Sequence, residues 1–538
     1  MATSDDTSIL EDTERSSGRA ALRKNVQAAM ALAGAVRSTL GPKGLDKLLL
    51  DSEGKIQVTN DGVTVLEAAK VQHPTARMLI SSSSTQDRVA RDGTTSTVLI
   101  TAEMLQNAWD LVNQGVHPTV IAAGYRLAEN QSQIILEEIS RNLKSEKEIL
   151  QATQTCLAGK GESSLQGTLS VLAVEAAAAI AEQGEDGIKA DPTRIKILAN
   201  KGGQSSDTHL VNGIVIAKRP AHPEMEERLE GGRILVIDGA LERQQMVMDA
   251  KLKITSPGML QAFRNKEQEL LTEQVEDVVS LGVNILAVKD GIDDYARSML
   301  EAKGITAYRR VERKDLEQIC ITTGATMVHS ANTASAKDIG SFHSSRQELW
   351  SDTSHWILEG STNKGQTLIT RGSSEEMLDE VERCFADALG VACQLHEEAR
   401  LLPGGGATQV ALARRLRRYA ETIPGREQLA VEAFADALEV IPRALAENAG
   451  LDSLGNLLEL TAAQSNSEND WLGLDLRSGT ISDMDEVGIR EPLRISRQAI
   501  KGATDSAVAV LRIDDILWAK QDAQVPDEVQ QQLDEQYG

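Results

Sequence analysis

Residues 92–115 read DGTTSTVLITAEMLQNAWDLVNQG, in which a loop of glycine and small hydroxyl side chains runs directly into a helix-prone segment. A loop that enters a helix N-terminus offers unpaired backbone N–H groups and the positive end of the helix dipole, which together favour a phosphate. Asp92 cannot contact phosphate itself because like charges repel, but its carboxylate suits a Mg²⁺ ion that bridges phosphates. The alternative, in which Asp92 only caps the helix, stays equally open at this point.

Two further glycine loops lie next to predicted helices. LGPKG at 40–44 follows one helix, and the triple glycine 404–406 precedes another, ATQVALARRLRRYA. Each loop alone is more typical of a helix cap or a hinge, and the missing GxxxxGK[ST] motif excludes a P-loop. Asp61 in NDGVT is another carboxylate, although a simple hairpin turn explains it as well. No HExxH, GxSxG or paired His/Cys ligand set is present, and the eight histidines are scattered.

The predicted elements change character twice along the chain. Residues 18–143 and those from about 400 onward show helical spacing, whereas 210–372 alternates short apolar strands with helices. This order indicates that the outer thirds form one domain around an α/β insertion. Within the first third, the alternation of KIQVTNDGVTVL predicts a hairpin that turns at Asn60-Asp61-Gly62. An amphipathic helical segment interrupts the α/β region at about 240–275.

Length and composition limit the class of protein. A chain of 538 residues divides into about three domains, and its 3% of aromatic residues implies an aliphatic core. The formal charge of −24 argues against binding to nucleic acid or anionic membranes. It fits a salt-rich cytoplasm or an ordinary acidic protein equally well. Four cysteines without CxxC pairing, and no apolar run of about 18 residues, predict a cytoplasmic protein in a reducing compartment.

Several stretches together resemble the group II chaperonins, the thermosome-like members of the TCP-1/cpn60 chaperonin family. They are, in order, VRSTLGPKGLDKLLLDSEGKIQVTNDGVTVLEAA, TQDRVARDGTTSTVL, GREQLAVEAFADALEVIPRALAENAGLD and EPLRISRQAIKGATDSAVAVLRIDDI. The resemblance extends from about residue 15 to 520, with the stretches in the family's order.

The resemblance implies an α+β multidomain fold. It comprises a mainly α-helical equatorial ATPase domain, an α/β intermediate domain and an α/β apical domain whose helical protrusion, at about 240–275, is a built-in lid. The segments are equatorial at 1–143 and 403–538, intermediate at 144–213 and 369–402, and apical at 214–368.

The resemblance also assigns roles to residues of the motifs. Asp92 would hold Mg²⁺, and Asp61 and Asp387 would be the catalytic carboxylates that place and activate water; Asp387 would reach the site only when the intermediate domain swings down. Lys160, in LAGKGE, would sense the γ-phosphate. The remaining residues would bind the nucleotide: Gly41, Pro42, Gly93, Thr94, Thr95 and Ser96 at the phosphates, and Gly405, Gly473 and Glu491 at the base and ribose.

The function that the resemblance implies is an ATP-dependent chaperone with ATP hydrolase activity. ATP/ADP and Mg²⁺, with K⁺ as an additional ion, are the expected cofactors. Unfolded proteins are the expected clients, and identical or paralogous subunits the expected partners, with a double ring of about 16 favoured. The alternative is a nucleotide-binding ring paralogue with weak hydrolysis and a structural or regulatory role. A stand-alone small-molecule kinase would need an acceptor pocket and no lid.

Four sequence features depart from the family pattern. Arg91 stands where the family has glycine before the aspartate, and Gln409 where an acidic residue is common. The 521–538 tail and the Trp350–Trp356 stretch also differ from the family's usual sequence. These departures fit either a group III type or a specialised archaeal paralogue.

Overall fold

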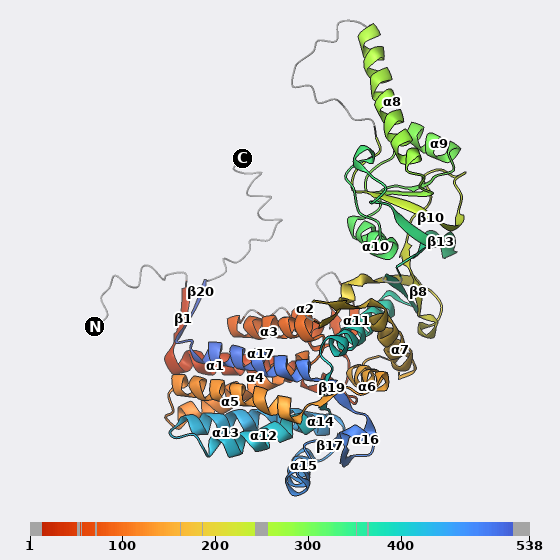
Figure 1. The fold of residues 1–538 in the computed structure, drawn as a ribbon. Helices are drawn as coiled ribbons and strands as arrows, with labels where there is room; N and C mark the ends of the chain where they lie inside the picture. The colour runs from red at the N-terminus through yellow and green to blue at the C-terminus, as the bar shows by residue number, and fades with distance from the viewer. Residues whose placement is uncertain are drawn as a thin grey trace, which may run out of the picture. The chain divides into compact units, whose positions relative to one another are not determined.

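The structure is a computed structural model that describes residues 13–519 apart from 51–53, 55, 70, 72, 162, 186, 243–256, 351, 363 and 364. The chain is a mixed helical and sheet protein of two compact units (Figure 1). The first unit joins residues 1–144, 158–160 and 400–538, and the second joins 145–157 and 161–399. Among the described helices, none combines the length and the apolar character needed to cross a membrane.

The first unit is built mainly from helices of both chain ends. Its helices are α1 (Gly18–Val36), α2 (Gly62–Ala68), α3 (Pro74–Ala90), α4 (Thr94–Asn113), α5 (Pro118–Ile139), α12 (Ala407–Ala420), α13 (Glu427–Leu438), α14 (Val440–Asn448), α15 (Ser453–Ser467), α16 (Met484–Val487) and α17 (Leu493–Leu511). Helices α1, α17, α4, α5, α13 and α12 lie side by side in layers (Figure 1).

One aliphatic core joins the two ends of the chain in this unit. Helix α4 is buried on most of its surface and packs against α1, α3, α13 and α17. The core runs through residues of the N-terminal helices, such as Leu105, and of the C-terminal helices, such as Leu438. Aromatic side chains contribute little, apart from an edge-on contact of Tyr125 with Phe434 at 5.7 Å between ring centres. The first and last thirds of the chain therefore fold around a shared interior.

Four small sheets complete the first unit. β1 (Thr13–Ser17) pairs antiparallel with β20 (Asp515–Ala519), and the other sheets are likewise antiparallel. They are the pair β2 (Lys47–Leu50) and β3 (Ile56–Thr59), the pair β17 (Leu472–Asp475) and β18 (Thr480–Asp483), and the group β19 (Arg490–Pro492), β16 (Arg400–Pro403) and β4 (Arg141–Asn142).

The hairpin predicted at Asn60-Asp61-Gly62 is wrong. The hairpin is formed by β2 and β3, and Asp61 is the N-cap of α2, which begins at Gly62. Val63, Val65 and Leu66 are buried on this short helix. Their spacing suits one face of a helix as well as it suits part of a strand, and the N-cap of Asp61 decides between them.

The second unit contains both helices and larger sheets. Its helices are α6 (Glu146–Leu157), α7 (Ser163–Ile180), α8 (Pro257–Ser280), α9 (Asp294–Ala302), α10 (Arg313–Thr323) and α11 (Glu375–Glu397). Its strands are β5 (Ala181–Gly184), β6 (Gly187–Ala190), β7 (Ile195–Lys201), β8 (His209–Asn212), β9 (Ile214–Ile216), β10 (Arg228–Ile237), β11 (Ile285–Val288), β12 (Thr306–Tyr308), β13 (Gly340–Trp350), β14 (Thr353–Gly360) and β15 (Gln366–Gly372).

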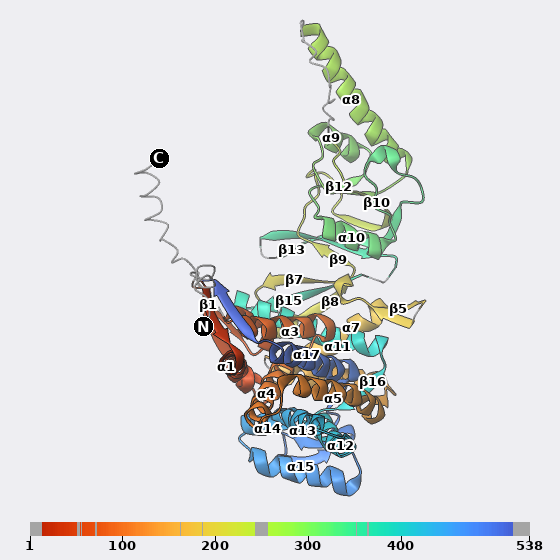
Figure 2. The same ribbon diagram turned by 90° about the vertical axis from the view of Figure 1, so that its left-hand side faces the viewer.

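A six-stranded sheet organises the middle of the second unit, in the order β12-β11-β10-β13-β14-β9. β10, β11 and β12 are parallel neighbours, and the other pairings are antiparallel. Alternate residues of β10 and β11 enter two different cores, one with α8 and α9 and one with α10. The three helices lie around this sheet (Figure 2). Burial on both faces explains why these strands are continuously apolar in sequence.

A second sheet, β7-β15-β8, packs with α11, which also lies against α6 and α7. The apolar segments RIKILANKGG, ILVIDG, VNILAVKDG, ITAYRRV and TLITRG contribute to β7, β10, β11, β12 and β15. Of the interrupting segment at 240–275, residues 243–256 lie outside the described residues, and α8 covers the rest from Pro257. The tail at 521–538 is likewise outside them.

Candidate functional site

Two helices of the first unit begin at a glycine N-cap, which offers no side chain to the first turn. The N-cap of α4 is Gly93, with φ 78°, and that of α12 is Gly406, with φ 75°. Both residues adopt the left-handed conformation, which glycine reaches at little cost. A glycine N-cap leaves first-turn N–H groups for an external acceptor, as an anion-binding helix terminus requires, although in α12 the N–H of Ala407 donates to the oxygen of Gly404 at 3.1 Å.

The loop before α4 is held in place by a buried amide. The Nε2 atom of Gln86 donates to the backbone oxygen of Asp92 at 2.8 Å and to that of Ile495 at 3.2 Å. A Cβ atom on Gly93 would lie 2.9 Å from Cγ2 of Ile495, so a larger residue does not fit there. The loop that presents Asp92 is thus fixed against the start of α17.

Asp61 is held close to the same helix terminus. Its Oδ2 atom accepts hydrogen bonds from the N–H and the hydroxyl of Thr64, at 3.0 and 2.7 Å. The neighbouring Gly62 packs directly on α4, since a Cβ atom there would lie 2.5 Å from Oγ1 of Thr95. The cap of α2 therefore brings the Asp61 carboxylate to the start of α4, where Thr94, Thr95 and Ser96 form the first turn.

The loop at 158–160 places a positively charged side chain next to Asp92. Nζ of Lys160 lies 3.5 Å from Oδ1 of Asp92, and Nδ2 of Asn60 donates to the backbone oxygen of Gly159. A Cβ atom on Gly159 would lie 2.5 Å from the backbone oxygen of Gly41 and 3.0 Å from Cα of Pro42. This close packing groups residues 158–160 with the first unit, whereas the sequence placed Lys160 in the intermediate segment.

The triple-glycine loop meets Gly473. The N–H of Leu474 donates to the oxygen of Gly405 at 2.9 Å, and a Cβ atom on Gly473 would lie 2.9 Å from the oxygen of Gly404. Helix α14 connects this loop with the one at 40–44, because Gly406 packs on its Pro442 and Gly41 on its Leu445. These two glycine loops, far apart in sequence, therefore both pack on α14.

Glu491 lies on β19, opposite Leu402 of β16, and its Oε1 atom accepts a hydrogen bond from Oγ of Ser496 at 2.6 Å. Burial raises the pKa of Glu491 to about 7, the negative charge of Asp92 raises it as well, and the Ser496 hydrogen bond lowers it. The side chain keeps some accessible surface although protein encloses its carboxyl. At neutral pH this carboxyl is thus poised between its two protonation states.

Because the pKa of Glu491 is raised, we predict that Glu491→Gln increases the stability of the fold and that the increase depends on pH. Between pH 4.5 and 7 the folded protein keeps a proton that the unfolded chain releases, so stability falls as pH rises through this window. The full effect is on the order of 3 kcal/mol above pH 7. In differential scanning fluorimetry without nucleotide, we expect the variant to have a higher melting temperature than the wild type at pH 8 and the same melting temperature at pH 5. An equal gain at both pH values would contradict a raised pKa.

Asp87 is a site residue that the motifs do not reveal. It lies in the last turn of α3, and burial, followed by the charge of Asp61, raises its pKa, while Arg91 and Lys160 lower it. Three carboxylates, those of Asp61, Asp87 and Asp92, therefore gather near one lysine. The position of Asp87 five residues before Asp92, in the helix that leads into the loop, was the only signal in the sequence.

Arg91 occupies a conformation that explains the glycine usual at this position. It ends α3 in the left-handed region, with φ 55° and its N–H donating to the oxygen of Asp87 at 2.8 Å. For a residue with a side chain this conformation costs about 1 kcal/mol. We expect Arg91→Gly to raise the apparent melting temperature, and Arg91→Ala, which removes the charge but keeps the strain, to give no increase. A higher melting temperature in Arg91→Ala would show that loss of the arginine charge, and not relief of strain, is the cause.

The remaining predicted catalytic residue, Asp387, belongs to the second unit. It lies on α11 and is 9% exposed. Its role at the site stays a prediction, as do the roles of the residues in the first unit.

The residues of the first unit fit a nucleotide with a divalent cation. Two uncapped helix starts suit phosphate oxygens, and the Asp61 and Asp92 carboxylates suit a hard cation. The buried Oδ1 atom of Asn60 has no hydrogen-bond partner in the described part of the chain, so the site also offers an acceptor for a cation or a donor group.

The chain is similar over nearly its whole length to proteins of one family. The model of the TCP-1/cpn60 chaperonin family matches residues 32–521. The chain is 41% identical to a thermosome subunit of Pyrococcus horikoshii over 95% of this chain and 93% of that protein. It is 42% identical to the thermosome subunit alpha of Archaeoglobus fulgidus (97% and 96%) and 40% identical to the thermosome subunit beta of Thermoplasma acidophilum (95% of each chain).

Proposed function

The chain belongs to the TCP-1/cpn60 chaperonin family, and from this membership we propose that it is a subunit of an ATP-driven protein-folding chamber. The observation that supports ATP as the energy source is the convergence of three glycine loops, Asp61, Asp92 and Lys160 in the first unit. Relatives named thermosome subunits, similar over nearly the whole chain, support the chaperone role.

Within this proposal the first unit binds the triphosphate. The first-turn N–H groups of α4 would donate to phosphate oxygens, and Lys160 would place its charge at the terminal phosphate. Asp92 would hold Mg²⁺, which when bound neutralises charge on the phosphates. Asp61 would orient the attacking water from its capped position, and Glu491 with Gly405 and Gly473 would contact the ribose and base.

Hydrolysis in this proposal is completed by the second unit. Asp387 would accept the proton of the attacking water, so turnover depends on a movement of the unit that carries it. We propose an intermediate domain at 144–213 and 369–402, of which residues 144, 158–160 and 400–402 belong to the first unit, and an apical domain at 214–368 with a lid at about 240–275. A carboxylate on a moving domain would couple phosphate cleavage to closure of the chamber.

The partners proposed are unfolded proteins and further copies of this chain or its paralogues in a double ring of about 16 subunits. The net charge of −24 disfavours nucleic acid and anionic membranes as partners, and we propose a cytoplasmic location. The weakly hydrolysing paralogue is not favoured, because the carboxylates Asp61, Asp92 and Asp387 are all present. The kinase alternative has no supporting feature among the described residues.

One paired experiment tests the function. The purified protein is imaged by electron microscopy with and without ATP, and its phosphate release is measured in the same buffer. We expect double rings that close when ATP is added, together with steady phosphate release. Monomers that hydrolyse ATP would contradict the chamber, and rings that bind nucleotide without phosphate release would favour the structural paralogue.

A further inference from the structure

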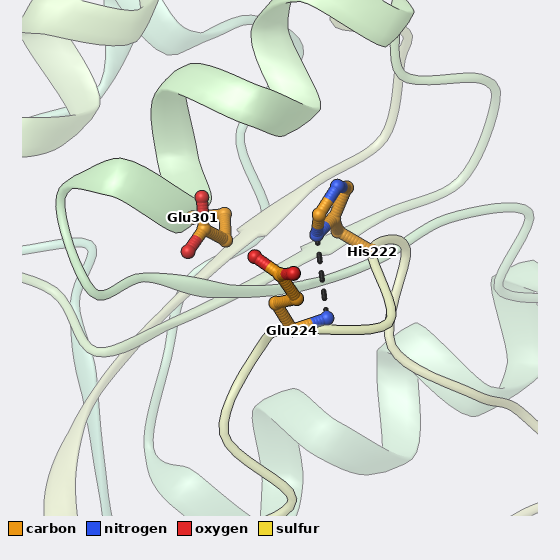
Figure 3. Close-up of side chains that lie close together, drawn as sticks. All are labelled: His222, Glu224 and Glu301. Atoms are coloured by element: carbon orange, nitrogen blue, oxygen red, sulfur yellow. Dashed lines mark hydrogen bonds between the residues drawn. The ribbon is translucent and has the colours of Figure 1, made fainter.

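A cluster of three metal-ligating side chains lies in the second unit. His222 and Glu224 belong to the loop between β9 and β10, and Glu301 belongs to the last turn of α9. One ligand atom from each residue lies within 4.8 Å of the others. Figure 3 shows the Glu224 carboxylate between that of Glu301 and the imidazole ring of His222.

The loop that carries two of these side chains is firmly anchored. The N–H of Ala221 donates to the oxygen of Ala307 at 2.7 Å, and Arg297 Nη1 donates to the oxygen of Ala221 at 3.1 Å. Oγ1 of Thr306 donates to the oxygen of Glu226 at 3.1 Å. Arg297 and Glu301 are four residues apart and share a face of α9, so one face of this helix holds both the loop and the third ligand. These contacts fix the backbone segments that carry the three ligand side chains.

Among the described residues, no cation forms an ion pair with the two carboxylates of the cluster. Neither the Glu224 nor the Glu301 carboxylate takes part in an ion pair or a side-chain hydrogen bond among residues that the structure describes. Two carboxylates this close repel each other, and the net charge of the chain adds to the negative potential. A bound cation would remove this repulsion.

The imidazole decides the kind of cation. Nδ1 of His222 accepts a hydrogen bond from the N–H of Glu224 at 3.3 Å. An ion ligated by Nδ1 would replace this hydrogen bond, and the proton of the neutral ring would then lie on Nε2. Mg²⁺ and Ca²⁺ prefer oxygen ligands throughout, whereas Zn²⁺ and its neighbours accept one imidazole with carboxylates. We propose that His222, Glu224 and Glu301 form a binding site for a divalent transition-metal ion of the Zn²⁺ class, with positions left for water.

Such an ion would join the loop to α9 across about 80 residues of sequence, counted from His222 to Glu301. The site shares no residue with the proposed nucleotide site. It would act as a metal clip of the second unit, and its occupancy is independent of whether the first unit hydrolyses ATP.

The test uses the full chain without a histidine tag, stripped with a chelator and kept in excess Mg²⁺ without nucleotide. Zn²⁺ binding is measured by competition with a chromophoric chelator, and Co²⁺ binding by visible absorption. We expect one saturable site per chain, and at least about tenfold weaker binding in His222→Ala and Glu301→Gln, since each variant loses one ligand. The Co²⁺ absorption bands of the site should disappear in the same variants.

Glu226→Gln is the matched control, because it removes one charge from the same loop outside the cluster and should bind as the wild type does. Melting curves without metal verify that each variant is folded, and His222→Asn replaces the alanine variant if that one is not. No saturable binding of Zn²⁺ or Co²⁺, or equal binding by all variants, would overturn the proposal.

Discussion

Asp387→Asn is expected to abolish steady-state ATP turnover while nucleotide binding stays close to that of the wild type. Asparagine keeps the size of the side chain but cannot accept a proton from water, and loss of a general base typically costs a factor of about 10² to 10⁴ in rate. Asp387 is 9% exposed within α11, so an isosteric change disturbs the packing less than alanine does. The fall should therefore lie in kcat and not in the affinity for ATP.

Single-turnover hydrolysis and binding of a fluorescent ATP analogue separate these two effects. Asp379→Asn is the control, because it changes an aspartate to asparagine at an exposed position of the same helix. It should hydrolyse ATP at the wild-type rate. Unchanged turnover in Asp387→Asn would exclude this carboxyl as the general base, and it would remove the coupling between the two units from the proposed mechanism.

Helical segments of the fold were predictable because their signals are local and long. The helix predicted after DGTTS corresponds to α4, and the region of helical spacing at 18–143 also contains α1, α3 and α5. The error at Asn60-Asp61-Gly62 has a physical cause, since aspartate before glycine suits a turn and also a helix N-cap. The hydrogen bonds from Thr64 to Asp61 decide for the helix, and they depend on a backbone conformation that the sequence does not state.

In the site, too, features that are contiguous in sequence were predictable, whereas features that join distant residues were not. Glycine loops and the DGTTS motif are contiguous, so they were found without a structure. Asp87 was missed because its raised pKa comes from burial and from Asp61, 26 positions earlier in the chain. The cluster of His222, Glu224 and Glu301 was missed because its third ligand comes from another element, and motif spacing does not detect such sets.

The hairpin of β2 and β3 leads to a prediction about assembly. Its cross-strand pairs Leu48–Val58 and Leu50–Ile56 place four apolar side chains on one face, with exposed fractions of 69, 43, 68 and 49%. A two-stranded hairpin is marginally stable alone, and an exposed apolar face of this kind marks an interaction site. If the chain forms rings, this face is the natural contact with a neighbouring copy.

Leu48→Lys combined with Leu50→Lys should therefore convert rings into monomers or small oligomers. A head-to-tail ring repeats the same contact at every interface, so a loss of about 2 kcal/mol for each buried leucine weakens all of them together. Size-exclusion chromatography with light scattering measures the mass. Gln57→Lys, which puts a lysine on the opposite face of the same hairpin, should assemble normally. Rings of full mass in the double variant would exclude this face as the contact, because two lysine charges cannot be buried there without a large cost.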